Sequence, residues 1–226
     1  MFNFLLEPIM GKSEYDDCVF CKIGKAEENK LPEHDLPIIQ TPDFFVVPAL
    51  GQFTEGYVLI CPKTHLLNLG TMDAVLFDRF LDLKEHVRTL LFEKYGRKPT
   101  FFEHGPASGL KRGGSCVDHA HLHAIPTDLD SIPDWVSENL EGGSIEDMNA
   151  VVEYAKTGKP YFFLECPDGT KYLYNARALP CQYGRQLFAR EFGALDKWDW
   201  HYHPFIEKMI ETRCHLRDQV KKKPGK

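Results

Sequence analysis

Apolar and polar positions change their period several times along the first half of the chain, which indicates alternating strands and helices. Between residues 72 and 95 the apolar residues recur every three or four positions, and Gly96 follows directly. This spacing predicts a long helix that ends at Gly96 and packs one face on a sheet. Short runs rich in β-branched and aromatic residues predict the strands of that sheet. The expected strands are residues 44–47, 57–61, 100–104 and 117–126.

Beyond residue 126 the periodic segments become shorter. Two apolar segments, 161–164 and 171–174, flank Pro167-Asp168-Gly169 and predict a hairpin. Helical patches are expected at residues 132–140, 145–155, 185–192 and 205–220. The pattern as a whole favours an α+β protein with a core domain, residues 1–126, and a C-terminal α+β extension, residues 127–226.

Composition and charge narrow the class of protein. The 226 residues are 43% hydrophobic and 12% aromatic, which is typical of a soluble folded protein. A net charge of -6 and a pI near 5.9 exclude a broad basic surface for duplex nucleic acid. The basic residues 221–226 are typical of a solvated chain end. No apolar run is long enough to span a membrane, and the first eight residues lack the pattern of a secretion signal.

Seven cysteines, an odd number, are scattered along the chain. A chain of this length does not need disulfides to fold, so the pattern indicates a reducing compartment, and we expect a cytoplasmic protein. One pair, Cys18 and Cys21, is spaced as half of a tetrahedral zinc site. The same spacing also fits a redox dithiol or two unrelated buried thiols.

Three histidines alternate with apolar residues in the last strand expected in the core. If the strand is regular, His119, His121 and His123 form a row on one side, and the residues between them face the core. A single histidine in a strand is usually a packing residue, but three at strict alternation beside a glycine pair favour chemistry. Such a row can bind a metal through neutral imidazoles, or hold one imidazole as a nucleophile for phosphorus.

This segment resembles the motif of the histidine-triad superfamily, which includes nucleoside phosphoramidases, dinucleoside polyphosphate hydrolases and a uridylyltransferase branch. The similarity continues upstream through residues 43–65, which end in Pro62-Lys63-Thr64-His65, and covers roughly residues 15–126. It implies an antiparallel sheet with a long packing helix, and a nucleotide hydrolase or nucleotidyl transferase. The motif residues are His119-Ala120-His121-Leu122-His123-Ala124-Ile125.

The resemblance also implies a role for each histidine. His121 would be the nucleophile that accepts the nucleotidyl group, and His123 would orient the site. His119 would either support His121 or bind metal. The uridylyltransferase branch has Gln at the position of His123, so this residue favours the hydrolase branches. Some branches complete a structural zinc site with two histidines and two cysteines; the matching residues here are Cys18, Cys21, His65 and His119.

Other residues are candidates for substrate binding. Backbone amides of Gly114 and its neighbours are suited to a phosphate group, with Ser115 and Cys116 beside them. Several relatives carry Ser at the position of Cys116, and a thiol is a weaker donor. His104, at the end of a predicted strand, is either a contact to phosphate or ribose or a satisfied surface histidine. Further candidates are Phe44, Phe45 and Leu50 for a base pocket, Lys111 and Arg112 for polyphosphate, and Gln182 and Arg185 for an anion.

Three functions are consistent with these residues. The first is an enzyme that cleaves a nucleotide or nucleotide conjugate through a covalent intermediate on His121. The second is a metal-dependent hydrolase that binds its ion with all three histidines. The third is a nucleotide-binding module with a weakened site, motivated by Cys116 and the unassigned extension. The resemblance also implies a possible homodimer.

Overall fold

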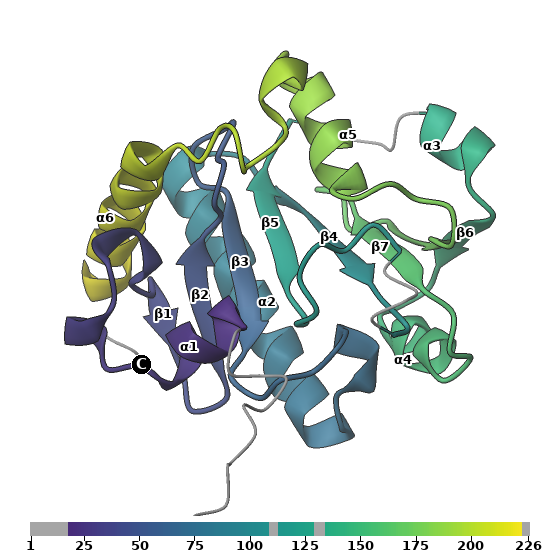
Figure 1. Cartoon of the computed structure of the whole chain (residues 1–226), viewed down its shortest axis with the longest axis horizontal. Coiled ribbons are helices and arrows are strands. Elements are labelled where there is room, and N and C mark those ends of the chain that lie inside the picture. Colours follow the sequence, from purple (N-terminus) through teal and green to yellow (C-terminus); the bar gives the residue numbers. More distant parts are fainter. Residues whose placement is uncertain (1–17, 109–112, 129–133, 223–226) are drawn as a thin grey trace, which may run out of the picture.

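The computed structural model describes residues 18–108, 113–128 and 134–222. Its centre is one eight-stranded sheet in the order β1-β2-β3-β5-β4-β7-β8-β6, in which every pairing is antiparallel (Figure 1). The strands are β1 (Ile39–Gln40), β2 (Phe44–Pro48), β3 (Val58–Pro62), β4 (Pro99–Gly105), β5 (Leu122–Pro126), β6 (Gly142–Ile145), β7 (Tyr161–Glu165) and β8 (Lys171–Asn175).

Helices cover both faces of the sheet. One apolar cluster contains side chains of α2, α4 and α6, and a second, on the opposite face, contains side chains of α1, α3 and α5. The helices are α1 (Val19–Lys25), α2 (Ala74–Tyr95), α3 (Asp134–Asn139), α4 (Asn149–Ala155), α5 (Tyr183–Glu191) and α6 (Ile206–Lys222). Short 3-10 turns lie at Glu28–Lys30, Glu33–Asp35, Leu69–Thr71 and Leu195–Lys197. The α+β class expected from the sequence is confirmed.

The long helix α2 begins and ends where local chemistry favours it. The Asp73 carboxylate accepts a hydrogen bond from the Leu76 amide at 2.8 Å, which caps the first turn. Gly96 ends the helix in the left-handed conformation, at φ 70°. The buried apolar stripe on the sheet consists of Phe77, Phe80, Leu83, Val87, Leu90 and Leu91. The predicted helix and its predicted end are confirmed.

Two predicted elements are wrong in their extent. The strand expected at 117–126 begins at Leu122, because Ala120 donates its amide to the Leu66 carbonyl at 2.7 Å rather than to a neighbouring strand. His119 and His121 therefore precede the strand, although Ala120 still faces the core. Residue 145 belongs to strand β6, not to a helix, because residues 142–145 pair with β8. That pairing is a long-range effect, and it overrides the local helical pattern.

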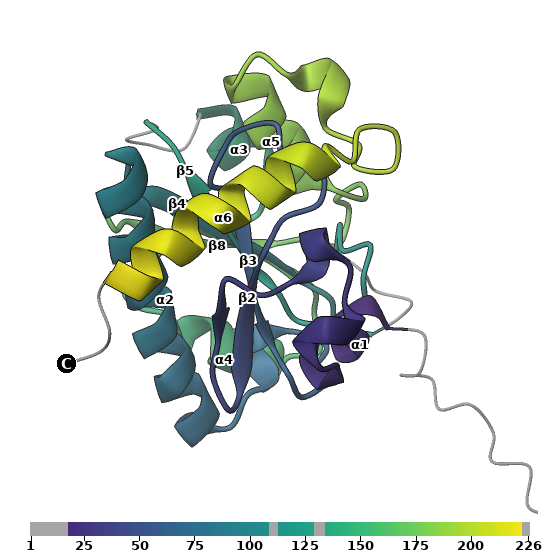
Figure 2. The same ribbon diagram turned by 90° about the vertical axis from the view of Figure 1, so that its left-hand side faces the viewer.

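The C-terminal half extends the same sheet. β7 pairs with β4 along five residues, so the strands after residue 127 continue the sheet that carries the first half. The last helix, α6, returns to the first half and lies against α2 and β2 (Figure 2). Its Thr212 hydroxyl donates to Gln52 at 2.8 Å and accepts from the Gly56 amide at 3.2 Å. The two parts share one sheet. The domain boundary near residue 127 stays a prediction from the sequence.

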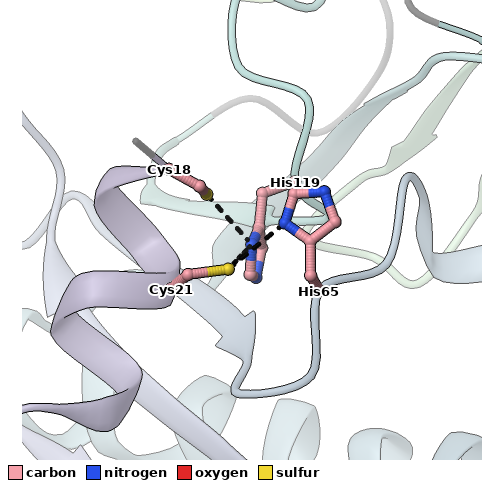
Figure 3. A group of neighbouring side chains, drawn as sticks. All are labelled: Cys18, Cys21, His65 and His119. Atoms are coloured by element: carbon pink, nitrogen blue, oxygen red, sulfur yellow. Dashed lines mark hydrogen bonds between the residues drawn. The ribbon is translucent and has the colours of Figure 1, made fainter. Parts of the chain in front are cut away.

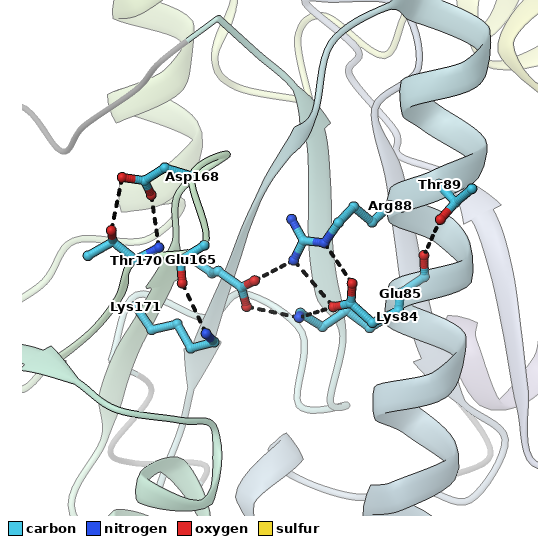
Figure 4. Close-up of polar contacts among 9 residues, drawn as sticks. Lys84, Glu85, Arg88, Thr89, Glu165, Asp168, Thr170 and Lys171 are labelled. Atoms are coloured by element: carbon cyan, nitrogen blue, oxygen red, sulfur yellow. Dashed lines mark hydrogen bonds and ion pairs between the residues drawn. The ribbon is translucent and has the colours of Figure 1, made fainter.

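A buried ion network joins α2 to β7 (Figure 4). Lys84 Nζ lies 2.9 Å from a carboxylate oxygen of Glu165, and Arg88 contacts the other oxygen. Both cations also lie over the Phe101 ring, at 5.0 and 4.7 Å from its centroid. A helix of the first half is thereby tied to a strand of the second. No helix in the described ranges is long and apolar enough to cross a membrane.

Candidate active site and metal cluster

His121 has one ring nitrogen bound and one available. Its Nδ1 lies 2.7 Å from the backbone carbonyl oxygen of His119. Because a carbonyl only accepts, Nδ1 carries the hydrogen, and the lone pair resides on Nε2. Burial lowers the pKa of His121, so the ring is neutral near pH 7. The ring lies between Phe20 of α1 and His123, with centroid distances of 5.2 and 4.8 Å.

His123 belongs to strand β5, and its side chain is buried. Its Nδ1 lies 2.6 Å from the Tyr57 hydroxyl, and its ring stacks on Phe102 with a centroid distance of 4.1 Å. Burial, followed by the charges of His121, His104 and Arg185, holds the pKa of His123 well below its usual range. Burial also raises the pKa of Tyr57 to about 12, so its hydroxyl stays protonated.

His119 is turned away from the other two. Its Nε2 donates to the Pro62 carbonyl at 2.9 Å, which leaves the lone pair on Nδ1. Nδ1 lies 3.4 Å from Cys18 Sγ and 3.6 Å from Cys21 Sγ. Burial lowers the pKa of His119 to about 4. The single row of imidazoles expected from strand alternation is therefore divided into one histidine facing the thiols and two facing a pocket.

Cys18, Cys21, His65 and His119 form a cluster whose four candidate ligand atoms all lie within 4.8 Å of one another (Figure 3). The distance from Cys21 Sγ to His65 Nδ1 is 3.2 Å. In a tetrahedral zinc site, bond lengths near 2.3 Å to sulfur and 2.05 Å to nitrogen place the two ligands about 3.6 Å apart. The cluster fits such an ion. Burial raises the pKa of Cys21 to about 11, so a metal would have to displace its proton.

The turn before the histidines is shaped by two glycines with positive φ, Gly113 at 53° and Gly114 at 85°. A β-carbon on Gly114 would lie 2.8 Å from His104 Nδ1, so no larger residue fits. The Ser115 hydroxyl is buried and donates to the Val117 carbonyl at 2.8 Å. Ser115 therefore holds the turn in place.

Cys116 forms a disulfide with Cys181, with Cα atoms 5.9 Å apart. The sequence predicts a thiol at Cys116, and for this residue the expectation is wrong. The 65-residue separation gives no local signal of the pairing. As a disulfide, Cys116 has no S–H with which to donate to a phosphate oxygen. The remaining cysteines, Cys18, Cys21, Cys61, Cys166 and Cys214, are free.

His104 is a buried histidine with both nitrogens bound. Its Nδ1 donates to the Gly113 carbonyl at 3.1 Å, and its Nε2 accepts the Gly184 amide at 3.0 Å. Burial lowers its pKa to about 3. It is not the surface histidine that the sequence allowed, and it has no nitrogen left for a substrate. It instead fixes the glycine turn against the start of α5.

The extension supplies a wall beside the histidines. Gln182, Arg185 and Trp200 line a small hollow together with His121 and His123; we call it the histidine hollow. The buried Arg185 donates to the carbonyls of Leu50 at 3.1 Å, Gly51 at 2.6 Å and Trp198 at 2.9 Å. Arg185 and Gln182 thus lie near the histidines, but Arg185 binds backbone rather than presenting an open fork to an anion.

A larger cavity of about 370 Å³ is also lined by His121 and His123; we call it the apolar cavity. Leu50, a base-pocket candidate, lines it, whereas Phe44 and Phe45 are buried in the core. Sequence reasoning missed most of its walls, since no local pattern links such distant positions. These walls include Val19, Phe20, Ile23, Leu59, Trp200 and Met209.

Lys111 and Arg112 lie outside the described residues. His201 is exposed, and its Nδ1 lies 3.0 Å from Asp199. Trp200 stacks on His201 with a centroid distance of 3.6 Å, so it packs as well as lining the histidine hollow.

Comparison with known proteins places these residues in context. The Hit protein of Bacillus subtilis (strain 168) is 27% identical over 115 residues, which are 49% of this chain and 71% of the relative. The chain is similar to histidine-triad proteins. No family model matches it.

Solved histidine-triad structures superpose only loosely. A HIT family hydrolase from Clostridium thermocellum shares 21% identity, with 52% of this chain and 96% of that chain covered and a TM-score of 0.40. A hypothetical histidine-triad nucleotide-binding protein from Sulfolobus tokodaii shares 14% identity, with 92% of this chain and 97% of that chain covered and a TM-score of 0.45. A zinc-bound histidine-triad protein from Mycobacterium smegmatis shares 19% identity, with 63% of this chain and 92% of that chain covered and a TM-score of 0.40. Scores of this size carry no argument about activity.

Proposed function

We propose that the protein is a histidine-triad nucleotide hydrolase or nucleotidyl transferase that acts through a covalent nucleotidyl intermediate on Nε2 of His121. The observation that carries this proposal is the 2.7 Å contact between His121 Nδ1 and the His119 carbonyl. It leaves the Nε2 lone pair available, and burial keeps the ring neutral at physiological pH. The apolar cavity beside His121 is large enough for a nucleoside.

The proposed reaction has two displacements. Nε2 forms a bond to phosphorus while the bond from phosphorus to the leaving group breaks, and the leaving group takes up a proton. The modified ring is then cationic, and the His119 carbonyl stabilises it through Nδ1–H. Water or another acceptor next attacks phosphorus, the P–N bond breaks, and the electron pair returns to Nε2. The acceptor loses one proton, so His121 is regenerated neutral.

His123 and Tyr57 are proposed to assist at the phosphate. Because Tyr57 stays protonated, its hydroxyl can donate to His123 Nδ1, which assigns the ring hydrogen of His123 to Nε2. An Nε2–H is a donor for a phosphate oxygen or for the leaving group. The closeness of the His121 and His123 rings, 4.8 Å between centroids, supports this shared role.

The cysteine–histidine cluster is proposed to be a structural zinc site. Four protein ligands leave no open position, so the ion would tie α1 to the end of β3 and to the triad. Phe20 of α1 contacts both His119 and His121, so an ordered α1 forms one side of the site. We expect about one zinc ion per chain by elemental analysis, and a large loss in Cys21→Ser but not in Cys214→Ser. Absence of zinc after expression in zinc-supplied medium contradicts this assignment.

The second candidate, a metal-dependent hydrolase using all three histidines, has less support. The nitrogens of His119 face two thiols and a carbonyl, whereas His123 Nδ1 faces Tyr57. In the described part of the chain, the one group suited to a metal is the cysteine–histidine cluster. The third candidate, a nucleotide-binding module, differs from the first two in that it binds a nucleotide without turning it over.

The test uses labelled adenylylated substrates with the native protein and with His121→Ala. We expect a labelled, acid-labile protein adduct in the native protein, and a loss of turnover of at least about 10³-fold in His121→Ala. His215→Gln is the matched control, since His215 is exposed and pairs with Glu55. Turnover that stops with chelator and forms no adduct favours the second candidate. Binding without turnover favours the third.

A further inference from the structure

A second, polar hollow lies beyond the histidine hollow. It measures about 930 Å³ and is formed by the glycine turn, the disulfide and the loops that flank β7 and β8. Lys159 and Arg177 are the charged residues that line it, and both are positive. We call it the cationic hollow. In a chain with a net charge of -6, a hollow lined by cations without an acid among its described residues is unexpected for a merely solvated surface.

The two cations are available to a ligand. Neither the Lys159 ammonium nor the Arg177 guanidinium has a hydrogen-bond or ion-pair partner within the part of the chain that the structure describes. Other lysines of this region are engaged, as Lys156 is with Glu153 at 2.6 Å. An acidic side chain does lie nearby, since Glu141 accepts from Asn175 at 3.1 Å, but it is not part of the lining.

The three hollows adjoin one another through shared wall residues. The apolar cavity and the histidine hollow share His121, His123 and Trp200 among their walls. The histidine hollow and the cationic hollow share Ser115 and Cys116. A substrate with its nucleoside in the apolar cavity and its phosphorus at His121 would therefore extend past the disulfide into the cationic hollow. In-line displacement places the leaving group on the side of the phosphorus opposite the nucleophile.

We propose that the cationic hollow is a leaving-group subsite for a phosphate-bearing, anionic group, with Lys159 and Arg177 as its specificity-determining residues. This inference rests on the proposed function, and it names the class of substrate that the site prefers. After the leaving group takes up its proton it is still an anion through its other phosphate oxygens, and the two cations bind those oxygens. Substrates with an uncharged leaving group gain nothing from them.

The test compares Lys159→Gln/Arg177→Gln with the native protein and with Lys156→Gln, a control on the same loop that does not line the hollow. Two adenylyl substrates are used, one with a nucleoside diphosphate as leaving group and one with an uncharged alkylamine. We expect the double variant to raise KM for the first about tenfold and to leave kcat/KM for the second within about twofold. Equal effects on both substrates, or none on either, overturn the proposal.

Binding of inorganic tripolyphosphate, measured by calorimetry, separates this inference from the proposed function. We expect salt-sensitive binding to the native protein that weakens about tenfold in the double variant and is unchanged in Lys156→Gln. If neither substrate is turned over but this binding pattern holds, the proposed function fails and the anion subsite stands. Absence of binding to the native protein, or equal binding to the double variant, overturns the subsite. Melting temperatures of all variants confirm that these exposed substitutions leave the fold intact.

Discussion

The two halves of the sheet use their polar residues differently. In the first half, His104, His119 and His123 are buried, and each has at least one ring nitrogen bound by a neighbour. In the second half, Lys159 and Arg177 face an open hollow. The first half thus holds groups whose tautomers and positions are set before a substrate arrives. The cationic hollow of the second half holds groups that can adapt to one.

Under the proposed function, the first half supplies the chemistry and the second half selects the substrate. Gln182, Arg185 and Trp200, which line the histidine hollow, belong to the extension. Besides the β4–β7 pairing and the packing of α6, the links between the halves include the buried ion network and the disulfide. They also include the hydrogen bonds from Arg185 to three backbone carbonyls, which we call the Arg185 clamp. Cutting each link in turn should show how far the prearranged half depends on the other.

The largest effect is expected from the buried ion network. Lys84→Met removes one of the two cations that neutralise the buried Glu165, and the remaining carboxylate charge is poorly compensated. We expect a loss of about 3–5 kcal/mol in the free energy of unfolding, measured in urea. Lys94→Met on the exposed face of α2 is the control and should change it by less than about 0.5 kcal/mol. Equal stability of the two variants contradicts a structural role for the network.

The disulfide should come next. Cys116→Ala/Cys181→Ala opens a loop closed over 65 residues, which gives the unfolded chain more freedom. We expect a loss of about 2–4 kcal/mol in the free energy of unfolding. The expected lowering is absent in Cys214→Ala, because that cysteine is free and exposed. A double alanine variant as stable as the native protein shows that the glycine turn holds without the bridge.

The Arg185 clamp should contribute somewhat less. Arg185→Met leaves three backbone carbonyls, including those of Leu50 and Gly51, without their donor. We expect a loss of about 2–3 kcal/mol by thermal or urea unfolding, and a higher KM because Leu50 lines the apolar cavity. Arg185→Lys keeps the charge but cannot reach all three carbonyls, so it should recover only part of the loss. Full recovery by Lys assigns the effect to charge instead.

The smallest effect is the change of folding stability with pH that the buried His104 of the first half causes. The pKa of His104 is about 3 in the fold, against about 6.5 in an unfolded chain, so below pH 6.5 the unfolded state binds a proton that the folded state does not. Its contribution to stability is complete above pH 6.5 and is lost as the pH falls, by about 1.4 kcal/mol per unit.

His104→Asn should therefore reduce the slope of stability against pH between 5 and 6 by about one proton. The difference in slope is the measurement, because Glu103 acts in the opposite sense. Burial raises the pKa of Glu103 to about 8, so its contribution is lost as the pH rises toward that value. His215→Gln, at an exposed histidine, should leave the slope unchanged. An unaltered slope in His104→Asn contradicts a buried, neutral His104.

Local patterns were sufficient for much of the fold. The stripe of α2 has a period that only a helix satisfies, and Gly96 ends it because glycine adopts positive φ without strain. The hairpin of β7 and β8 turns at Pro167-Asp168-Gly169 as its residues predict. The alternation at residues 119–124 placed Ala120, Leu122 and Ala124 in the core, and the histidine motif located the candidate nucleophile. These signals lie within one turn or one strand.

What the sequence left open are contacts between positions far apart. Whether Cys116 is a thiol or half of a disulfide depends on Cys181, and which way His119 turns depends on Pro62 and the two thiols. The pairing of β6 with β8 overrode a helical pattern, and α5 brought Gln182 and Arg185 beside His121. Periodicity reports which face of an element is buried, but not against what it is buried. The histidine motif could be read from the chain alone, whereas the direction of each imidazole and the shape of the hollows around them arise only when distant segments pack together.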